Sequence, residues 1–270
     1  MTINEWLSGA QAQLTKAGIE TARLDCLLLL EDILQKNRTW ILANPETNIS
    51  PTSLRKLKNV FNRRMTHEPM AYILGRSEFY GRQFEVSADV LQPRPESEAI
   101  IELLLQIVPN APKPLIADVG TGSGALGITA SLELPNSSVD LIDIDDKALK
   151  TAKINANKFT TSIRVIKSDL LAHADSNYDI LLCNLPYVPD GFKVNKAAEH
   201  EPAIALYAGS DGLDLYRKLF GQLELRKNKP LYLIIESFPD QHAKIAEFAT
   251  NCGYTLQTTL DFVQLYKYGK

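Results

Sequence analysis

The sequence between residues 114 and 236 alternates short apolar segments with longer amphipathic ones, and this alternation restricts the fold more than any other feature. The apolar segments predict strands at 115–119, 139–144, 163–167, 179–184 and 231–236, and the amphipathic ones predict helices at 122–134, 146–159 and about 212–225. Strands that are apolar on both faces and joined through helices are typical of a parallel sheet covered on both sides. The chain is therefore expected to have an α/β fold.

The region before this alternation has a different pattern. Residues up to about 65 show helical spacing of apolar side chains with no intervening strand, which predicts a small helical bundle. An aromatic segment at 78–86 with a central glycine predicts a β-hairpin. Pro93 and Pro95 then delay the next helix until about residue 97.

After residue 241 the sequence predicts a helix and then two strands separated by Asp261. This strand pair suggests an antiparallel addition near one edge of the sheet. We expect three parts: a helical domain at 1–75, a β-hairpin linker at 76–93 and an α/β domain at 94–270.

Composition and charge argue against several classes of function. The 270 residues are 45% hydrophobic, enough for a substantial core, and the net charge of −3 argues against broad electrostatic binding to nucleic acid. The three cysteines are dispersed, without a C-x-x-C pair or a histidine at ligand spacing, so we expect reduced thiols and no metal site. The N-terminus lacks signal-peptide features, and no apolar run approaches the ~18 residues of a membrane span. We expect a cytoplasmic protein.

A glycine-rich segment joins the first strand of the alternating region to its first helix. The strand 115–119 leads directly into Gly120 to Gly124 (GTGSG). Glycine lets backbone N–H groups approach a ligand that a Cβ atom would repel. Asp143 ends the second strand, where a carboxylate can accept hydrogen bonds from both hydroxyls of a ribose. The pattern predicts a nucleoside-binding site.

The glycine spacing alone leaves two cofactors open. The run GSGALG satisfies G-x-G-x-x-G, the pattern of dinucleotide-binding oxidoreductases. Asp118, just before the loop, completes D-x-G-x-G-x-G, which resembles the first motif of class I methyltransferases. That resemblance implies a Rossmann-like sheet and S-adenosylmethionine held by the loop. It also implies that the adenine lies near Asp169 and Leu170, at the end of the third strand.

The fourth strand runs into a polar and aromatic segment, Asn184-Leu185-Pro186-Tyr187. An amide nitrogen is a poor nucleophile because its lone pair is shared with the carbonyl group. A site that methylates it must hold both N–H bonds and aim the nitrogen at the methyl group. The Asn184 side-chain oxygen and the Leu185 carbonyl are suitable acceptors, and the Tyr187 ring offers a flat surface for a planar amide. Such positioning lowers a barrier by several kcal/mol, with roughly 7–11 kcal/mol as the upper range, and needs no general base before transfer.

The N-L-P-Y segment resembles the N-P-P-Y tetrad of methyltransferases that act on planar, amide-like nitrogens of protein glutamine or of nucleic-acid bases. The tetrad therefore indicates the reaction class rather than the substrate. Leu185 stands where those enzymes have their first proline, which keeps the carbonyl but loses the fixed φ angle. Because Pro186 still biases Leu185 toward an extended backbone, we expect the site to survive. Restoring proline is expected to leave activity equal or higher.

Segments along nearly the whole chain resemble the bacterial peptide chain release factor glutamine methyltransferases. They lie at 17–34, 64–86, 91–98 and 201–213. Within LQPRPESE, Gln92 and Ser97 depart from the family's L-I-P-R-P-E-T-E. A related family that modifies a ribosomal protein is disfavoured, because its version of P-R-P-E-x-E differs. The C-terminal DFVQLYKYGK departs from the D-x-x-G-x-x-R common in relatives, and we assign no function there.

The resemblance implies a specific reaction. A methyl group passes from S-adenosylmethionine, leaving S-adenosylhomocysteine, to the glutamine of the GGQ motif in class 1 release factors. It assigns the cofactor to Asp118, Gly120, Thr121, Gly122, Ser123, Gly124, Asp143, Asp169, Leu170 and Asn184, and the glutamine to Asn184, Leu185, Pro186 and Tyr187. It implies that the domain at 1–75 recognises the substrate. We expect a monomer that binds neither a membrane nor, directly, nucleic acid.

Three other interpretations stay open. A nucleic-acid amine methyltransferase would use the same tetrad, but the pI near 5.9 and the lack of a separate basic recognition domain oppose it. A non-catalytic protein would bind the cofactor or a release factor with a tetrad weakened at Leu185. An NAD-dependent oxidoreductase is favoured by the glycine spacing alone and opposed by the tetrad.

Two charged segments have more than one interpretation. Arg94, Pro95 and Glu96 fit equally a rigid turn held by a salt bridge and a role in shaping the entrance of the site. The basic helix between Arg55 and Arg64 fits a solvated face better than a docking surface.

Overall fold

The computed structural model describes residues 1–108, 113–161 and 163–269, and it divides into two compact units. Unit 1 comprises Met1–Gly75 together with Val194–His200. Unit 2 comprises Arg76–Lys193 and Glu201–Lys270.

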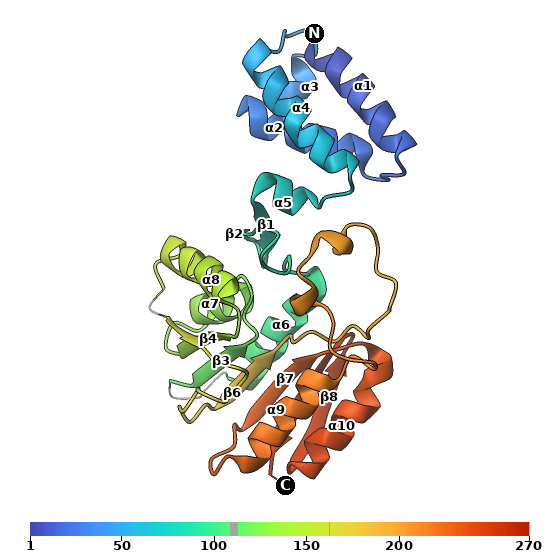
Figure 1. The fold of residues 1–270 in the computed structure, drawn as a ribbon. Helices are drawn as coiled ribbons and strands as arrows, with labels where there is room; N and C mark the ends of the chain where they lie inside the picture. Colours follow the sequence, from blue (N-terminus) through green and yellow to red (C-terminus); the bar gives the residue numbers. More distant parts are fainter. Residues whose placement is uncertain (109–112, 162, 270) are drawn as a thin grey trace. The chain divides into compact units, whose positions relative to one another are not determined.

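Unit 1 is helical, as predicted. Its elements are α1 (Ile3–Lys16), α2 (Ala22–Leu34), α3 (Arg38–Ala43), α4 (Pro51–Met65), α5 (Met70–Leu74) and the short η2 (Ala198–His200) (Figure 1). Thr2 begins α1 through a capping box, because its hydroxyl accepts from Glu5 N–H while the Glu5 carboxylate accepts from Thr2 N–H. Ser50 caps α4, whose first residue is Pro51. Leucines spaced along α1, α2 and α4 form the core of the unit.

Unit 2 contains a seven-stranded sheet in the order β5-β4-β3-β6-β7-β9-β8. The strands are β3 (Leu115–Val119), β4 (Ser138–Asp143), β5 (Arg164–Lys167), β6 (Ile180–Cys183), β7 (Tyr232–Glu236), β8 (Tyr254–Leu260) and β9 (Val263–Tyr268). The strands from β5 to β7 in this order pair in parallel, whereas β9 runs antiparallel to both β7 and β8. The predicted mostly parallel sheet, with an antiparallel strand near its C-terminal edge, is confirmed.

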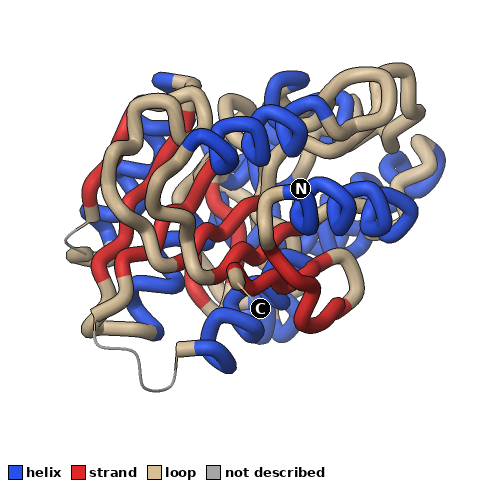
Figure 2. Tube along the Cα trace, turned by 90° about the horizontal axis from the view of Figure 1, so that it is seen from below, coloured by secondary structure: helices blue, strands red, loops and turns tan. Residues whose placement is uncertain are grey.

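Helices cover both faces of this sheet, which Figure 2 shows as a central layer of strands. The helices are α6 (Glu98–Ile107), α7 (Ala125–Glu133), α8 (Asp146–Lys158), α9 (Asp214–Leu225) and α10 (His242–Asn251). Alternate residues of one strand face opposite cores: Leu181 packs in the core that contains α9 and α10, and Leu182 in the core that contains α6, α7 and α8. Burial on both faces is why the strands are apolar throughout.

The predicted hairpin forms as β1 (Arg76–Phe79) and β2 (Arg82–Glu85) and packs within unit 2. Phe79 and Phe84 are buried in the core that contains α6, α7 and α8. Asn155 of α8 fastens the hairpin, because its side-chain oxygen accepts from Glu85 N–H at 2.7 Å and its Nδ2 donates to Glu85 O at 2.9 Å. The hairpin is thereby fixed to the sheet that carries the site.

The strand order reverses at β3, and this reversal marks the carboxyl ends of β3 and its neighbours as the place where a ligand would bind. From β3 the chain moves to β4 and β5 on one side and later to β6 and β7 on the other. Ligands of open α/β sheets bind beyond the carboxyl ends of the strands at such a reversal. The loops there include the short turns η1 (Pro95–Ser97), η3 (Ala203–Ala205) and η4 (Pro239–Gln241).

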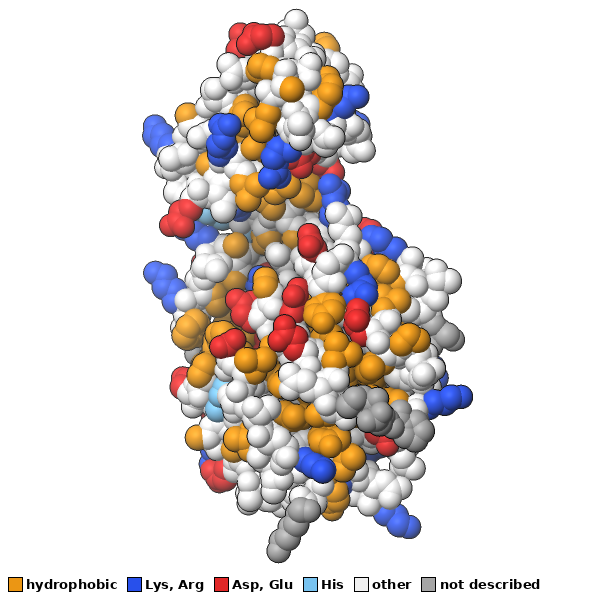
Figure 3. Space-filling model, turned by 180° about the vertical axis from the view of Figure 1, so that it is seen from behind, with side chains coloured by type: hydrophobic (Ala, Val, Ile, Leu, Met, Phe, Trp, Pro, Cys, Tyr) orange, Lys and Arg blue, Asp and Glu red, His pale blue; other side chains and the backbone are white. Residues whose placement is uncertain are grey.

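On the face seen in Figure 3, described Lys and Arg side chains are scattered among Asp and Glu without forming a broad basic surface. Among the described residues, no helix is both long and apolar enough to cross a membrane.

Candidate active site

The loop between β3 and α7 depends on glycine at two positions for different reasons. Gly120 and Gly122 have φ angles of +73° and +55°, which L-residues rarely adopt. A Cβ atom at Gly120 would lie 2.8 Å from Leu185 Cδ2, whereas one at Gly122 would meet no atom within 4 Å. Gly122 therefore presents open backbone to a cavity that it lines.

Asp118 lies beneath this loop rather than in the cavity. Its Oδ2 accepts hydrogen bonds from Thr121 Oγ1 at 2.5 Å and from Gly127 N–H at 2.8 Å. Burial raises the pKa of the Asp118 carboxyl to about 6, although both hydrogen bonds act in the opposite direction. Its Oδ1 has no hydrogen-bond partner among the described residues. The side chain thus shapes the loop from below.

Asp143 ends β4 and lines the cavity. Its Oδ2 accepts from Gly122 N–H at 2.9 Å, and its Oδ1 accepts from Asp145 N–H at 3.0 Å. Burial raises the pKa of this carboxyl, and the backbone hydrogen bonds oppose that effect. Since each carboxylate oxygen can accept more than one hydrogen bond, both retain capacity for ligand hydroxyls.

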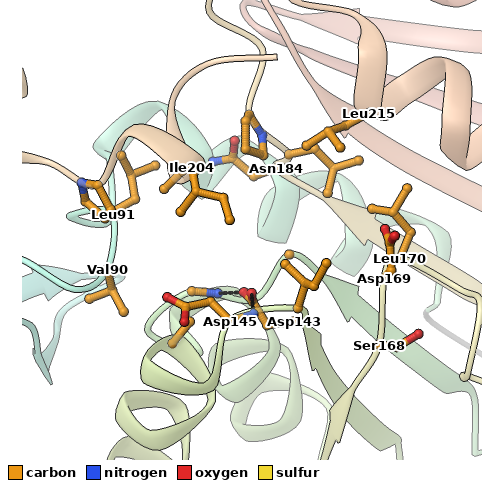
Figure 4. A pocket seen from close by; sticks show the side chains of 18 of the residues that line it. Val90, Leu91, Asp143, Asp145, Ser168, Asp169, Leu170, Asn184, Ile204 and Leu215 are labelled. Carbon is orange, nitrogen blue, oxygen red and sulfur yellow. Dashed lines mark hydrogen bonds between the residues drawn. The ribbon is translucent and has the colours of Figure 1, made fainter. Parts of the chain in front are cut away.

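The cavity has a volume of about 240 Å³ and is mainly apolar. In Figure 4, Asn184, Ile204 and Leu215 lie across it from Asp143 and Asp145. Its apolar lining includes Val90, Leu91, Ile144, Leu170, Ile204 and Leu215. Ile204 is 60% exposed and Ile144 50% exposed, so a ligand in the cavity that covers them would bury apolar surface.

One wall of the cavity is formed by the residues that come directly after β5 in the chain. Leu170 has a φ angle of +53°, which is unusual for a residue with a Cβ atom. Its neighbour Asp169 forms a salt bridge with Lys218 of α9, and both line the cavity. Lys218 and Leu215 come from a helix that sequence reasoning assigned to the fold alone. Their spacing is that of an ordinary amphipathic helix, so no sequence signal identified them.

The tetrad begins where β6 ends, and three of its residues, Asn184, Leu185 and Pro186, line the cavity. Asn184 Nδ2 donates to Ser97 Oγ at 2.8 Å. Tyr187 lies to one side, where its hydroxyl donates to Glu236 Oε1 at 3.0 Å. Its ring meets Phe238 edge-on, with centroids 4.9 Å apart, and burial keeps the phenol pKa well above its usual value.

Leu185 fills a defined position. It is 2% exposed, and its side chain packs against the loop at Gly120. Its N–H donates to Tyr216 Oη at 3.3 Å, and that hydroxyl donates to Glu236 O at 2.5 Å. A proline at this position would lack the N–H and could not donate the hydrogen bond to Tyr216.

Arg94 belongs to a salt bridge and also to a smaller recess beside Asn184. Its Nη2 lies 2.7 and 2.6 Å from the two carboxylate oxygens of Glu201, whose side chain is 1% exposed. The recess is lined by Pro93, Arg94 and Ser97 together with the glycine loop. Arg94 therefore fits both interpretations given to this segment: it holds a turn through a salt bridge, and it forms part of the wall of a recess beside Asn184.

The structure brings most of the predicted residues to one place. Those lining the main cavity are Gly120, Gly122, Asp143, Asp169, Leu170, Asn184, Leu185 and Pro186. Thr121 and Ser123 line the smaller recess. Asp118, Gly124 and Tyr187 line neither.

Comparisons with known proteins agree with this arrangement. The PrmC N-terminal domain family matches residues 5–75, and the methyltransferase small domain family matches residues 99–202. The release factor glutamine methyltransferase of Coxiella burnetii is 35% identical over 94% of this chain and 92% of its own length. This chain belongs to the release factor glutamine methyltransferase family.

Other members of the family show similar agreement. The release factor glutamine methyltransferase of Deinococcus radiodurans is 30% identical, covering 97% of this chain and 95% of its own. That of Bacillus subtilis is 34% identical, covering 87% and 84%. As predicted, the chain is a methyltransferase and its methyl donor is S-adenosylmethionine. The oxidoreductase interpretation of the glycine spacing is wrong.

Solved structures support the fold. The catalytic domain of hMettl16, in complex with a MAT2A 3'UTR hairpin, superposes with a TM-score of 0.56 at 15% identity, covering 82% of this chain and 83% of its own. A methyltransferase from Pyrococcus furiosus gives 0.51 at 16% identity, covering 81% and 100%. At these identities the likeness concerns the Rossmann-like fold of class I methyltransferases, which the sequence predicted.

Proposed function

We propose that this chain transfers the methyl group of S-adenosylmethionine to the side-chain amide nitrogen of the glutamine in the GGQ motif of class 1 peptide chain release factors. The observation that carries the proposal is the position of Asn184. It lines the cavity at the carboxyl end of β6, and its Nδ2 is already engaged by Ser97. Its Oδ1 is thereby the group left to accept a substrate N–H.

The residues around the cavity fit the proposed cofactor. Gly122 offers backbone with no protein atom within 4 Å of a Cβ position, the space a ligand needs to approach the loop. Asp143 would accept the ribose hydroxyls, and Leu170, Ile144 and Ile204 would enclose the adenine. When bound, S-adenosylmethionine supplies an electrophilic methyl group on a positively charged sulfur.

The proposed catalytic contribution of the chain is positioning. Asn184 Oδ1 and Leu185 O would each accept one N–H of the target amide, which fixes its plane and aims the nitrogen. The amide proton becomes acidic once the nitrogen carries the methyl group, so no base is needed before transfer. Holding both reacting groups in line lowers the barrier by several kcal/mol, up to about 7–11 kcal/mol in the best-oriented systems.

Tyr187 would provide a wall for the planar amide. Its hydroxyl is tied to Glu236 and its ring is set edge-on to Phe238, so the ring has little freedom to rotate. Because the phenol remains neutral, it donates one hydrogen bond and adds no charge beside the target nitrogen. This role stays a prediction from the tetrad.

We further propose that unit 1 recognises the release factor outside the GGQ motif. The match of residues 5–75 to the PrmC N-terminal domain supports a role shared with the family. Its partner would be a folded protein, and we propose that the chain acts as a monomer.

The function is tested by methyl transfer from labelled S-adenosylmethionine to a purified class 1 release factor. A release factor whose GGQ motif is changed to GGA is the matched control. Label on the intact motif alone is expected. Label on both proteins would place the methyl group elsewhere, and label on neither, with the cofactor still bound, would exclude this substrate.

A further inference from the structure

A buried carboxylate lies directly behind the tetrad. Glu236 ends β7, and β7 pairs in parallel with β6 so that Ile235 is opposite Cys183. Glu236 therefore lies beside Asn184. Its side chain is buried, at 1% exposure for the residue, and lines neither the main cavity nor the recess. A buried carboxylate needs donors around it.

The donors around Glu236 come from the tetrad and from η1. Tyr187 donates to Oε1 at 3.0 Å. Oε2 has no hydrogen-bond partner among the described residues, and the nearby side chains of Ser97 and Asn184 act to lower the Glu236 pKa. Burial acts more strongly and raises that pKa. Tyr187 therefore donates to one carboxyl oxygen, and Ser97 and Asn184, which are hydrogen-bonded to each other, lie beside the same carboxyl group.

The carboxyl group of Glu236 can determine which end of the Asn184 amide faces the cavity. Its oxygen and its NH₂ group have nearly the same shape, and only the oxygen can accept a substrate N–H. A serine hydroxyl cannot decide between the two ends, because it can donate or accept. When ionised, the Glu236 carboxylate only accepts, so it draws the Ser97 proton and the Asn184 NH₂ group toward itself.

We propose that Glu236 and Ser97 are positioning residues that turn the Asn184 amide so that its oxygen faces the target amide. Ser97 Oγ–H points to Glu236, the Ser97 lone pairs receive Asn184 Nδ2–H, and Asn184 Oδ1 is left toward the cavity. The same carboxylate fixes Tyr187 through its hydroxyl. The inference rests on the proposed methylation of an amide, since it concerns the acceptor that holds that amide.

The kinetic test compares Ser97→Ala, Ser97→Thr and Glu236→Gln with Ser237→Ala, a matched control at a buried serine. Among the described residues, the Ser237 hydroxyl makes one hydrogen bond, of 3.4 Å, to Phe238 O. Ser97→Ala and Glu236→Gln are expected to lower kcat at least tenfold, with the dissociation constant for S-adenosylmethionine and the unfolding midpoint nearly unchanged. Ser97→Thr, which keeps the hydroxyl, is expected to restore kcat to within twofold of wild type, and Ser237→Ala to leave it unchanged. A Ser97→Ala or Glu236→Gln enzyme with more than half the wild-type kcat would overturn the proposal. So would a loss of cofactor affinity as large as the loss of kcat.

A second readout does not depend on the substrate. In a ¹⁵N-labelled protein, the Asn184 side-chain NH₂ signals, assigned through Asn184→Asp, are expected to exchange slowly with solvent in wild type and in Ser97→Thr. They should exchange at least tenfold faster in Ser97→Ala and Glu236→Gln. Unchanged exchange in both variants would refute the orientation of Asn184 even if methylation occurs. Protected signals with no methylation would instead refute only the proposed function.

Discussion

Replacing Asp118 by asparagine is expected to flatten the pH dependence of folding stability. Burial raises the pKa of the folded Asp118 carboxyl from 3.8 to about 6, despite the hydrogen bonds from Thr121 and Gly127. Because the folded value exceeds the unfolded one, the folded state binds this proton more tightly. The stability from this group is fully present below pH 3.8 and is lost as the pH rises through 6. The difference corresponds to roughly 3 kcal/mol, at about 1.36 kcal/mol per pH unit.

Asparagine does not titrate, so the free energy of unfolding of wild type should fall by roughly 3 kcal/mol relative to Asp118→Asn between about pH 4 and 7. The new NH₂ group has no acceptor at the Oδ1 position, which adds a pH-independent cost of about 1–3 kcal/mol. Urea unfolding followed by circular dichroism across this pH range measures both effects. Asp175→Asn, at an exposed carboxyl, is the control and should track wild type. If Asp118→Asn also tracks wild type, the buried carboxyl is not the titrating group.

Three further substitutions test the loop, the ribose acceptor and the tetrad. Gly122→Ala should weaken S-adenosylmethionine binding by about tenfold or more in calorimetry, because the added Cβ atom enters the cavity. It should also lower the free energy of unfolding by about 1 kcal/mol, because alanine is strained at this positive φ angle. Gly81→Ala, also at positive φ in open space, is the control and should lower stability by a similar amount and leave binding intact. Asp143→Ala should also lower cofactor affinity by about tenfold or more, and an unchanged dissociation constant would remove Asp143 from the ribose site. Leu185→Pro should destabilise the fold by roughly 1–3 kcal/mol, because the hydrogen bond to Tyr216 and part of the buried side chain are lost. An unfolding midpoint at or above wild type would show that leucine is not needed there.

The Leu185→Pro prediction refines the expectation from sequence. The tetrad pattern indicates that proline leaves activity equal or higher, which concerns turnover of the folded enzyme. The structure adds the contacts of Leu185 with Gly120 and Tyr216, which a pattern of four residues does not contain. Stability and turnover should therefore be measured separately in this variant.

The sequence predicted the features that depend on local patterns. Strand β3 was predicted at its observed residues because a short segment that is apolar except for Asp118 precedes a glycine loop. Asp143 and Asn184 were singled out because polar residues at the ends of apolar strands need an explanation, and both line the cavity. Helices and strands of this kind follow from side-chain periodicity alone.

The sequence did not predict the features that depend on distant contacts. Ser97 was noted only as a departure from a motif, yet it contacts Asn184 across 87 positions of the chain. Glu236 ends an apolar strand much as Asn184 does, but no neighbouring motif drew attention to it. The grouping of Val194–His200 with unit 1 also has no local signature. Such relations appear only once the fold brings the segments together.

The most direct test of the central claim is the position of the methyl group in a release factor, located by tandem mass spectrometry after incubation with wild type and with Asn184→Ala. The account predicts a methyl group on the side chain of the GGQ glutamine with wild type and none with the variant, whose affinity for S-adenosylmethionine should remain nearly intact. A methyl group on another residue would contradict the proposed substrate. Full methylation of the glutamine by Asn184→Ala would contradict the proposed hold on its amide.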